Sequence, residues 1–177
     1  MGAVVVHEFM TLDGVIDNPS WSMEYGFDPK MGGAIAQIMQ GSKALLMGRN
    51  TYELFAPTWS KRTAEEDPGA PFMNESPKYV VSATLSDLEW SNSTVLGAYS
   101  PEAVRQLKEK GEVSVSGPAL AAEAIRAGLV DEYQFFFVPV LVGGGKRALP
   151  DGVREELELL EKRRFGSGVV FVRYRQR

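Results

Sequence analysis

The order of strand and helix signals along the chain constrains its fold more than any other feature. An apolar, β-rich run at residues 3–10 precedes a helical pattern at 28–41, and this alternation recurs down the chain. Repeated β–α–β order favours a mostly parallel sheet with helices on its faces. Two final runs, at residues 157–165 and 168–175, predict a closing antiparallel hairpin. The sequence therefore predicts an α/β fold with a mixed, mainly parallel sheet.

The remaining elements follow from shorter patterns. Ser100 and Pro101 suit the N-cap and first position of one helix, and Gly128 is placed to end the helix that starts near residue 118. Residues 57–76 show no regular pattern, so we expect an irregular loop that is either functional or mobile. A second mobile loop is expected at 11–27. Further strands are predicted at 44–47, 78–82, 94–96, 113–115 and 133–142, the last as a buried central strand.

Composition excludes several classes of function. The chain has 177 residues, which suits a single domain spanning 1–177, and it contains no cysteine. With one histidine, a Ser-His-Asp triad would have to use His7, and no metal site is expected. The net charge of −4 argues against nucleic-acid binding, and no apolar stretch approaches a membrane span of about 18 residues. We expect a cytoplasmic protein.

Candidate chemistry lies where predicted strands run into helices. Ligands of open α/β sheets bind at the carboxyl ends of the strands, where helix N-termini offer free N–H groups to phosphates. One such junction carries Gly48 and the forked cation of Arg49. Others present Ser82 with Thr84, and Ser116 with Gly117; no GxGxxG or GxxxxGK[ST] motif accompanies them. Together these junctions indicate a nucleotide that carries an additional phosphate.

Six short motifs follow one another along the chain. They are Thr11 to Ile16 (TLDGVI), Met47 to Glu53 (MGRNTYE), Lys78 to Leu85 (KYVVSATL), Val115 to Pro118 (VSGP), Gly128 to Glu132 (GLVDE) and Pro139 to Gly145 (PVLVGGG). In this order, the motifs resemble the dihydrofolate-reductase-like superfamily, and specifically the reductase domain of the bifunctional riboflavin-biosynthesis deaminase/reductase and its stand-alone bacterial relatives. The resemblance implies a three-layer fold with a sheet of about eight strands and helices on both faces.

The resemblance also implies NADPH as the cofactor and assigns residues to it. Arg49 and Thr51 would flank the adenosine phosphates, with Gly48 allowing close approach, and Ser82 and Thr84 would meet the ribose 2′-phosphate. The segment with Gly14 and Ile16 would lie over the nicotinamide. The turn with Ser116 and Gly117, and the amides of Ala119 and Leu120, would cradle the diphosphate.

The substrate side of the predicted site departs from dihydrofolate reductases. Their first helix carries a carboxylate, whereas the matching interval here falls near Gly32 and Gly33, with Glu24 and Asp28 just before it. Asp13 matches an aspartate of the riboflavin reductases and is the predicted catalytic residue, although Asp-Gly is also an ordinary turn signal. No deaminase motif is present.

The sequence thus predicts a reductase that transfers a hydride to a small heterocycle, of the 5-amino-6-(5-phosphoribosylamino)uracil reductase type. A dihydrofolate reductase-like enzyme and a catalytically silent NADP-binding regulatory protein are the alternatives. His7 and Trp21 are candidate substrate contacts, each with a purely structural role as its alternative. The resemblance further suggests a homodimer.

Overall fold

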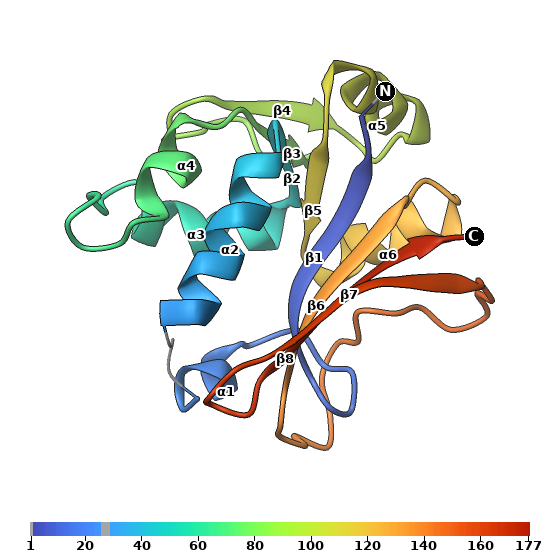
Figure 1. Cartoon of the computed structure of the whole chain (residues 1–177). Helices are drawn as coiled ribbons and strands as arrows, with labels where there is room; N and C mark the ends of the chain where they lie inside the picture. Colours follow the sequence, from blue (N-terminus) through green and yellow to red (C-terminus); the bar gives the residue numbers. More distant parts are fainter. Residues whose placement is uncertain (1, 26–28) are drawn as a thin grey trace.

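One eight-stranded sheet organises the computed structural model, which describes residues 2–25 and 29–177 (Figure 1). The strands are β1 (Val4–Thr11), β2 (Ala44–Gly48), β3 (Lys78–Val81), β4 (Ser93–Gly97), β5 (Val113–Ser116), β6 (Glu132–Val138), β7 (Leu157–Arg164) and β8 (Val170–Gln176). They lie in the order β4-β3-β2-β5-β1-β6-β8-β7. The helices are α1 (Ser20–Met23), α2 (Pro29–Gly41), α3 (Arg49–Trp59), α4 (Ala70–Glu75), α5 (Pro101–Lys110) and α6 (Pro118–Arg126).

Parallel pairing runs through β4, β3, β2, β5, β1 and β6 without interruption. β8 then pairs antiparallel with β6, and β7 pairs antiparallel with β8. This confirms the mixed, mainly parallel sheet and the closing hairpin. Because the six parallel strands point the same way, their carboxyl ends share one edge of the sheet.

The two faces of the sheet have separate cores, as the alternation of side chains along β1 requires. Val6 and Met10 pack in a cluster that includes Leu120 of α6 and Val104 of α5. Phe9 packs on the other face. α2 and α6 therefore cover opposite sides of the sheet (Figure 1).

The core beneath α2 is rich in aromatic rings. Phe136 is fully buried there, and its ring stacks on Phe9 with centroids 4.8 Å apart. Phe165 and Phe171 adjoin the same ring, and Met31 of α2 closes the cluster. A third cluster, built around Trp90, Tyr52 of α3 and Met73 of α4, lies at the β3 end of the sheet.

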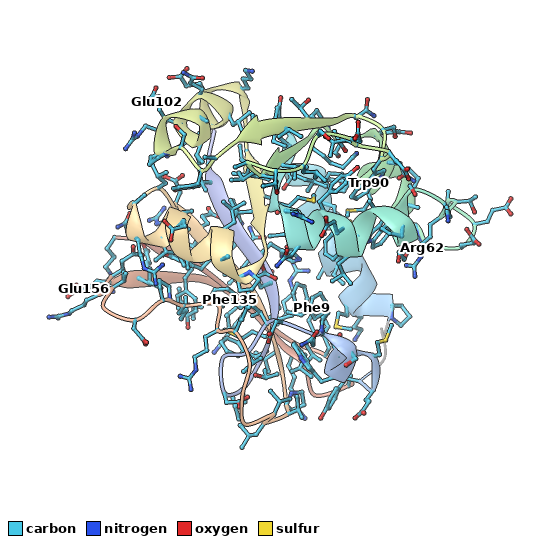
Figure 2. The ribbon with its side chains drawn as sticks, turned by 180° about the vertical axis from the view of Figure 1, so that it is seen from behind. Phe9, Arg62, Trp90, Glu102, Phe135 and Glu156 are labelled. Atoms are coloured by element: carbon cyan, nitrogen blue, oxygen red, sulfur yellow. The ribbon has the colours of Figure 1, made fainter. Side chains whose placement is uncertain are left out.

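Charged side chains lie at the periphery. Arg62, Glu102 and Glu156 project outward in Figure 2, while Phe9 and Phe135 lie close to the strands. This distribution matches the ordinary preference of charged groups for water.

Local signals predicted the helix ends well. The Ser100 hydroxyl accepts a hydrogen bond from the Ala103 amide at 3.3 Å, which confirms the N-cap with Pro101 behind it. After α6, Gly128 takes a positive φ of 62° and donates its amide to Ile125 at 2.9 Å. This confirms Gly128 as the stop signal, since glycine adopts that conformation without strain.

Two predicted boundaries are wrong. The strand expected at 133–142 ends at Val138, because Pro139 has no N–H to continue the ladder, and Leu141 is 68% exposed. The irregular loop expected at 57–76 is shorter: α3 runs to Trp59, and α4 forms where Ala70 and Met73 can be buried.

The other predicted loop, at 11–27, contains the short helix α1. Its residues 26 and 27 lie outside the described part of the chain, as does Asp28, the first residue of the helix expected at 28–41.

Candidate cofactor and substrate site

The shared edge brings the predicted phosphate-binding junctions together. Met47 pairs with Ser116, and Gly48 pairs with Val81, so β5, β2 and β3 end side by side. Segments that are 30 or more residues apart in the sequence therefore form one continuous surface at the ends of these strands.

The first junction is the N-terminus of α3. Gly48 is its N-cap, and no side chain caps the helix there, which leaves first-turn amides available. Arg49 is half exposed; its Nε atom pairs with Glu53 at 2.7 Å, and its Nη1 atom donates to the Thr84 hydroxyl at 3.0 Å. The guanidinium group is thereby held between α3 and the turn after β3.

The second junction is the N-terminus of α6, which begins at Pro118. Gly117 has a φ of 98°, and a Cβ atom placed on it would lie 2.3 Å from the Thr51 hydroxyl oxygen. Only glycine fits this turn, because a side chain would be strained and would also collide with α3. No side chain caps α6, so the amides of Ala119 and Leu120 in its first turn remain free of a capping group.

The turn after β3 is built around Ser82. Its buried hydroxyl accepts hydrogen bonds from the amides of Thr84, at 3.2 Å, and Leu85, at 3.0 Å. The Thr84 hydroxyl, already in contact with Arg49, is the more exposed of the two. The structure thus brings Arg49, Thr84 and Ser82 into one cluster.

A carboxyl group that the sequence reasoning missed lies beside the second junction. Glu8 is partly buried in β1, and its Oε1 atom accepts the Gly117 amide at 2.6 Å. Burial raises the pKa of Glu8 to about 8, although the Gly117 hydrogen bond acts in the opposite direction. The signal was available: Glu8 is the one acidic residue within the apolar run of the first strand.

Asp13 braces two loops against each other. Its carboxylate accepts the Thr11 hydroxyl at 2.6 Å and the amides of Gly143 and Val142 at 2.9 and 3.3 Å. The Thr11 hydrogen bond, followed by that of Gly143, lowers the pKa of Asp13. Asp13 is therefore charged at neutral pH and is a poor proton donor.

The loop after β1 lies beside the loop after β6 (Figure 1), and further backbone hydrogen bonds join the two loops. The Ile16 amide donates to Lys146 at 2.9 Å, and the Ala148 amide donates to Gly14 at 3.1 Å. Gly14 has a φ of 85°, and Ile16 is buried in the core cluster under α6. The predicted nicotinamide-covering segment is thus anchored at the same edge.

The two predicted substrate contacts lie on the α2 side. His7 is edge-on to Phe136, with ring centroids 5.6 Å apart, and its buried Nδ1 atom has no hydrogen-bond partner. Burial lowers the pKa of His7 to about 4. Trp21 donates its indole N–H to the Asp17 carbonyl at 3.2 Å and packs against the same aromatic cluster.

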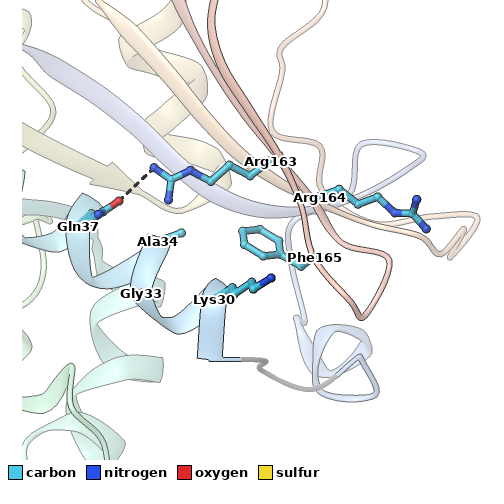
Figure 3. Close-up of a pocket in the computed structure, with 7 residues that line it drawn as sticks. All are labelled: Lys30, Gly33, Ala34, Gln37, Arg163, Arg164 and Phe165. Atoms are coloured by element: carbon cyan, nitrogen blue, oxygen red, sulfur yellow. Dashed lines mark hydrogen bonds between the residues drawn. The ribbon is translucent and has the colours of Figure 1, made fainter.

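A hollow of about 510 Å³ lies between α2 and the end of β7 (Figure 3). Arg163 reaches across it to the Gln37 side chain at 3.1 Å, and Lys30 and Arg164 add two further positive charges. None of the predicted cofactor residues lines this hollow. We therefore place the candidate site at the strand ends, where uncapped helices and Arg49 converge, rather than here.

The residues at the edge fit a dinucleotide phosphate. The turn at Gly117 has no room for a Cβ atom, whereas a Cβ on Gly48 would meet nothing within 4 Å, so the backbone beside the guanidinium is open. Two uncapped helix N-termini and one arginine supply the N–H donors that phosphates require. Among the described residues, no group of three potential metal ligands is found.

The strand order gives an α/β fold of mixed topology and of the dihydrofolate-reductase-like type. The chain belongs to the RibD C-terminal domain family, which residues 3–171 match. This confirms the resemblance found in the motifs. Within the described residues no helix is long and apolar enough to cross a membrane.

Individual relatives agree with this assignment. The uncharacterized protein YyaP of Bacillus subtilis is 28% identical over 97% of this chain and 93% of its own length. A putative riboflavin biosynthesis protein from Shewanella shares the fold with a TM-score of 0.82 at 17% identity, covering 99% of both chains.

A bifunctional protein shows the same fold within a longer chain. It is the diaminohydroxyphosphoribosylaminopyrimidine deaminase/5-amino-6-(5-phosphoribosylamino)uracil reductase of Thermotoga maritima, with a TM-score of 0.68 and 17% identity. The match covers 99% of this chain and 57% of the Thermotoga chain.

Proposed function

We propose that this protein is an NADPH-dependent reductase that transfers a hydride to a small heterocyclic substrate. The observation that carries the proposal is the Arg49–Thr84 contact beside two uncapped helix N-termini on one sheet edge. A guanidinium next to a hydroxyl suits a dianionic 2′-phosphate better than the hydroxyl of NADH. Membership of the RibD C-terminal domain family supports the reductase class.

The roles of the cofactor residues follow from their places at the edge. Arg49 and Thr84, with Ser82 behind them, would hold the 2′-phosphate. Thr51 and Gly48 would approach the adenosine phosphates, since Thr51 already lies against Gly117. The amides of Ala119 and Leu120, after Ser116 and Gly117, would hold the diphosphate at the positive end of the α6 dipole.

When bound, NADPH would supply a hydride from its nicotinamide ring, and the chain would supply orientation, exclusion of water and a proton path. Gly14 and Ile16 lie in the segment that is hydrogen-bonded to the loop after β6, and they would line the nicotinamide end of the site. Asp13 would contact the substrate as a charged hydrogen-bond acceptor that orients ring N–H groups. His7 and Trp21 would contribute to the substrate side through the aromatic cluster under α2.

The substrate that we propose is of the 5-amino-6-(5-phosphoribosylamino)uracil type. Dihydrofolate is a weaker candidate, because the described residues of α2 include no carboxylate to hold a pterin ring. A silent NADP-binding protein is the remaining alternative, and turnover separates it from both enzymes.

The test is to follow NADPH absorbance with purified protein and each substrate, alongside a fluorescence titration of NADPH binding. We expect tight NADPH binding, with consumption in the presence of the phosphoribosylaminouracil and slow or no consumption with dihydrofolate. Binding without consumption of NADPH by any candidate would leave only the regulatory alternative. Failure to bind NADPH would overturn the cofactor assignment.

The homodimer and the cytoplasmic location expected from the sequence complete this proposal. Sedimentation of the purified protein at several concentrations would test the dimer.

A further inference from the structure

The strongest unexplained feature is the Glu8 carboxyl group in the middle of the sheet. A glutamate inside a strand is uncommon, and this one faces the side of the sheet covered by α6, as do its neighbours Val6 and Met10. Its partner is the Gly117 amide, 109 residues away in sequence and 2.6 Å away in space. An isolated charge at such a position costs free energy, so its presence calls for a role.

Gly117 is held from two sides. Glu8 accepts its amide hydrogen, and the Thr51 hydroxyl oxygen lies 2.3 Å from the position that a Cβ atom on Gly117 would take. The positive φ of Gly117 then turns the chain directly into Pro118 and the first turn of α6. The direction of the free amides of Ala119 and Leu120 thus depends on a turn that Glu8 fixes.

The charge state of Glu8 matters because the same turn is where we place the cofactor diphosphate. A carboxylate there would repel the phosphates in a partly buried setting of low dielectric. Burial raises the pKa of Glu8 to about 8, and among the described residues no neighbouring charge contributes to that pKa. The neutral acid still accepts the Gly117 amide through its carbonyl oxygen.

We propose that Glu8 is a positioning residue for the cofactor: its neutral carboxyl group holds the Gly117 turn in the diphosphate-binding conformation. This inference rests on the proposed NADPH site and goes beyond it, because it makes cofactor affinity depend on one buried proton. Cofactor binding is then strong while Glu8 is protonated and weakens once Glu8 ionises.

The experiment compares wild type with Glu8→Gln and Glu8→Asp, and uses Glu123→Gln as a matched control. Glu123 is an exposed glutamate of α6, the helix that follows the Gly117 turn, and it forms a surface ion pair with Arg126. NADPH dissociation constants are measured by fluorescence titration about one pH unit below and one above the pKa of Glu8. Across that range the 2′-phosphate, with a second pKa of about 6, stays dianionic.

We expect wild type and Glu123→Gln to lose affinity by on the order of 10-fold from the lower to the higher pH. Glu8→Gln accepts the same amide but cannot ionise, so its affinity at the lower pH matches wild type and does not change with pH. Glu8→Asp is one methylene too short to reach Gly117, and it binds NADPH about 10-fold more weakly at the lower pH.

Two results would overturn the proposal: equal pH dependence in wild type and Glu8→Gln, or an unchanged affinity in Glu8→Asp at the lower pH. Circular dichroism and unfolding midpoints of each variant show whether a loss comes from misfolding, and the Glu8→Gln comparison stands even if Glu8→Asp unfolds. A wild-type protein that binds no NADPH at either pH would instead refute the proposed function itself.

Discussion

His7 and Glu8 are consecutive residues of one strand, yet they serve opposite faces of the sheet in different ways. Glu8 faces the α6 side, has a hydrogen-bond partner at Gly117 and lies beside the uncapped helix that we assign to the cofactor. His7 faces the α2 side, where Phe9 and Phe136 surround it and its buried Nδ1 atom has no partner.

The difference shows that the two faces of one sheet can give adjacent residues of a strand different surroundings. On the α6 side, a polar group reaches a turn at the carboxyl edge and can act on a ligand there. On the α2 side, aromatic rings pack around His7, and burial lowers the pKa of its imidazole. Burial shifts both pKa values toward the neutral species, upward for Glu8 and downward for His7.

The largest expected effect is a loss of stability when Phe136, in the core beneath α2, is replaced. Phe136→Ala removes a fully buried ring that contacts Phe9, Phe165 and Phe171, and should lower the free energy of unfolding by about 3–5 kcal/mol. Urea unfolding followed by circular dichroism measures the loss. Leu141→Ala, at a position 68% exposed, is the control and should change stability by no more than about 0.5 kcal/mol. A similar loss in both variants would contradict the assigned core.

A substitution at the carboxyl edge of the sheet, at Arg49, should affect cofactor binding rather than folding. Arg49→Ala removes the guanidinium that contacts Thr84 and should weaken NADPH binding by about 10–100-fold, with a much smaller effect on NADH. Parallel fluorescence titrations of the two cofactors give the ratio. Equal losses for NADPH and NADH would show that Arg49 does not read the 2′-phosphate.

The pH dependence of the free energy of unfolding distinguishes Glu8 from His7. Because the pKa of Glu8 rises from about 4.5 unfolded to about 8 folded, the folded protein binds the extra proton between these values. Its contribution to stability is complete below about pH 4.5 and is lost as pH rises through 8, by at most about 1.4 kcal/mol per pH unit. Urea unfolding of wild type and Glu8→Gln between about pH 6.5 and 7.5, below the range in which Lys78 titrates, should show the slope in wild type only. Equal pH dependence of the unfolding free energy in wild type and Glu8→Gln would contradict the raised pKa of Glu8.

His7 should produce the opposite slope at lower pH. Its pKa falls from 6.5 to about 4 on folding, so the unfolded chain binds the extra proton between these values, and stability is lost as pH falls through this range. Between about pH 4.5 and 6.5 the effects of His7 and Glu8 therefore oppose each other. In His7→Phe, unfolding measurements should show the Glu8 slope extending down through this window. An unchanged pH profile would show that His7 is not held neutral.

The smallest effect is expected at Asp13. If this carboxylate orients the substrate and braces the loops rather than donating a proton, Asp13→Asn should reduce kcat by about 10-fold or less, short of the 100-fold or more typical of a general acid. Steady-state kinetics at saturating NADPH measure the change. A larger fall in kcat at an unchanged KM would instead make Asp13 the proton donor.

Much of the fold, and the strand ends that form the candidate site, could be predicted because the signals are local. The caps at Ser100 and Gly128, the strand ends at Gly48 and Ser116, and the final hairpin depend on a few neighbouring residues. The errors came where a local pattern competes with chain context. The apolar run at 133–142 continues past Pro139, which ends the strand, and the irregular composition of 57–76 hides α4, which tertiary burial of Met73 stabilises.

By itself, the sequence determined the order of the elements and which segments end in glycine, serine or arginine, since backbone propensity and turn chemistry act within a few residues. Only the tertiary structure decided which of these segments meet. The Arg49–Thr84 contact, the closure of Gly117 on Thr51 and the bond from Gly117 to Glu8 all depend on the strand order β3-β2-β5-β1. Strand order is set by long-range packing of the two faces, and no local pattern encodes it.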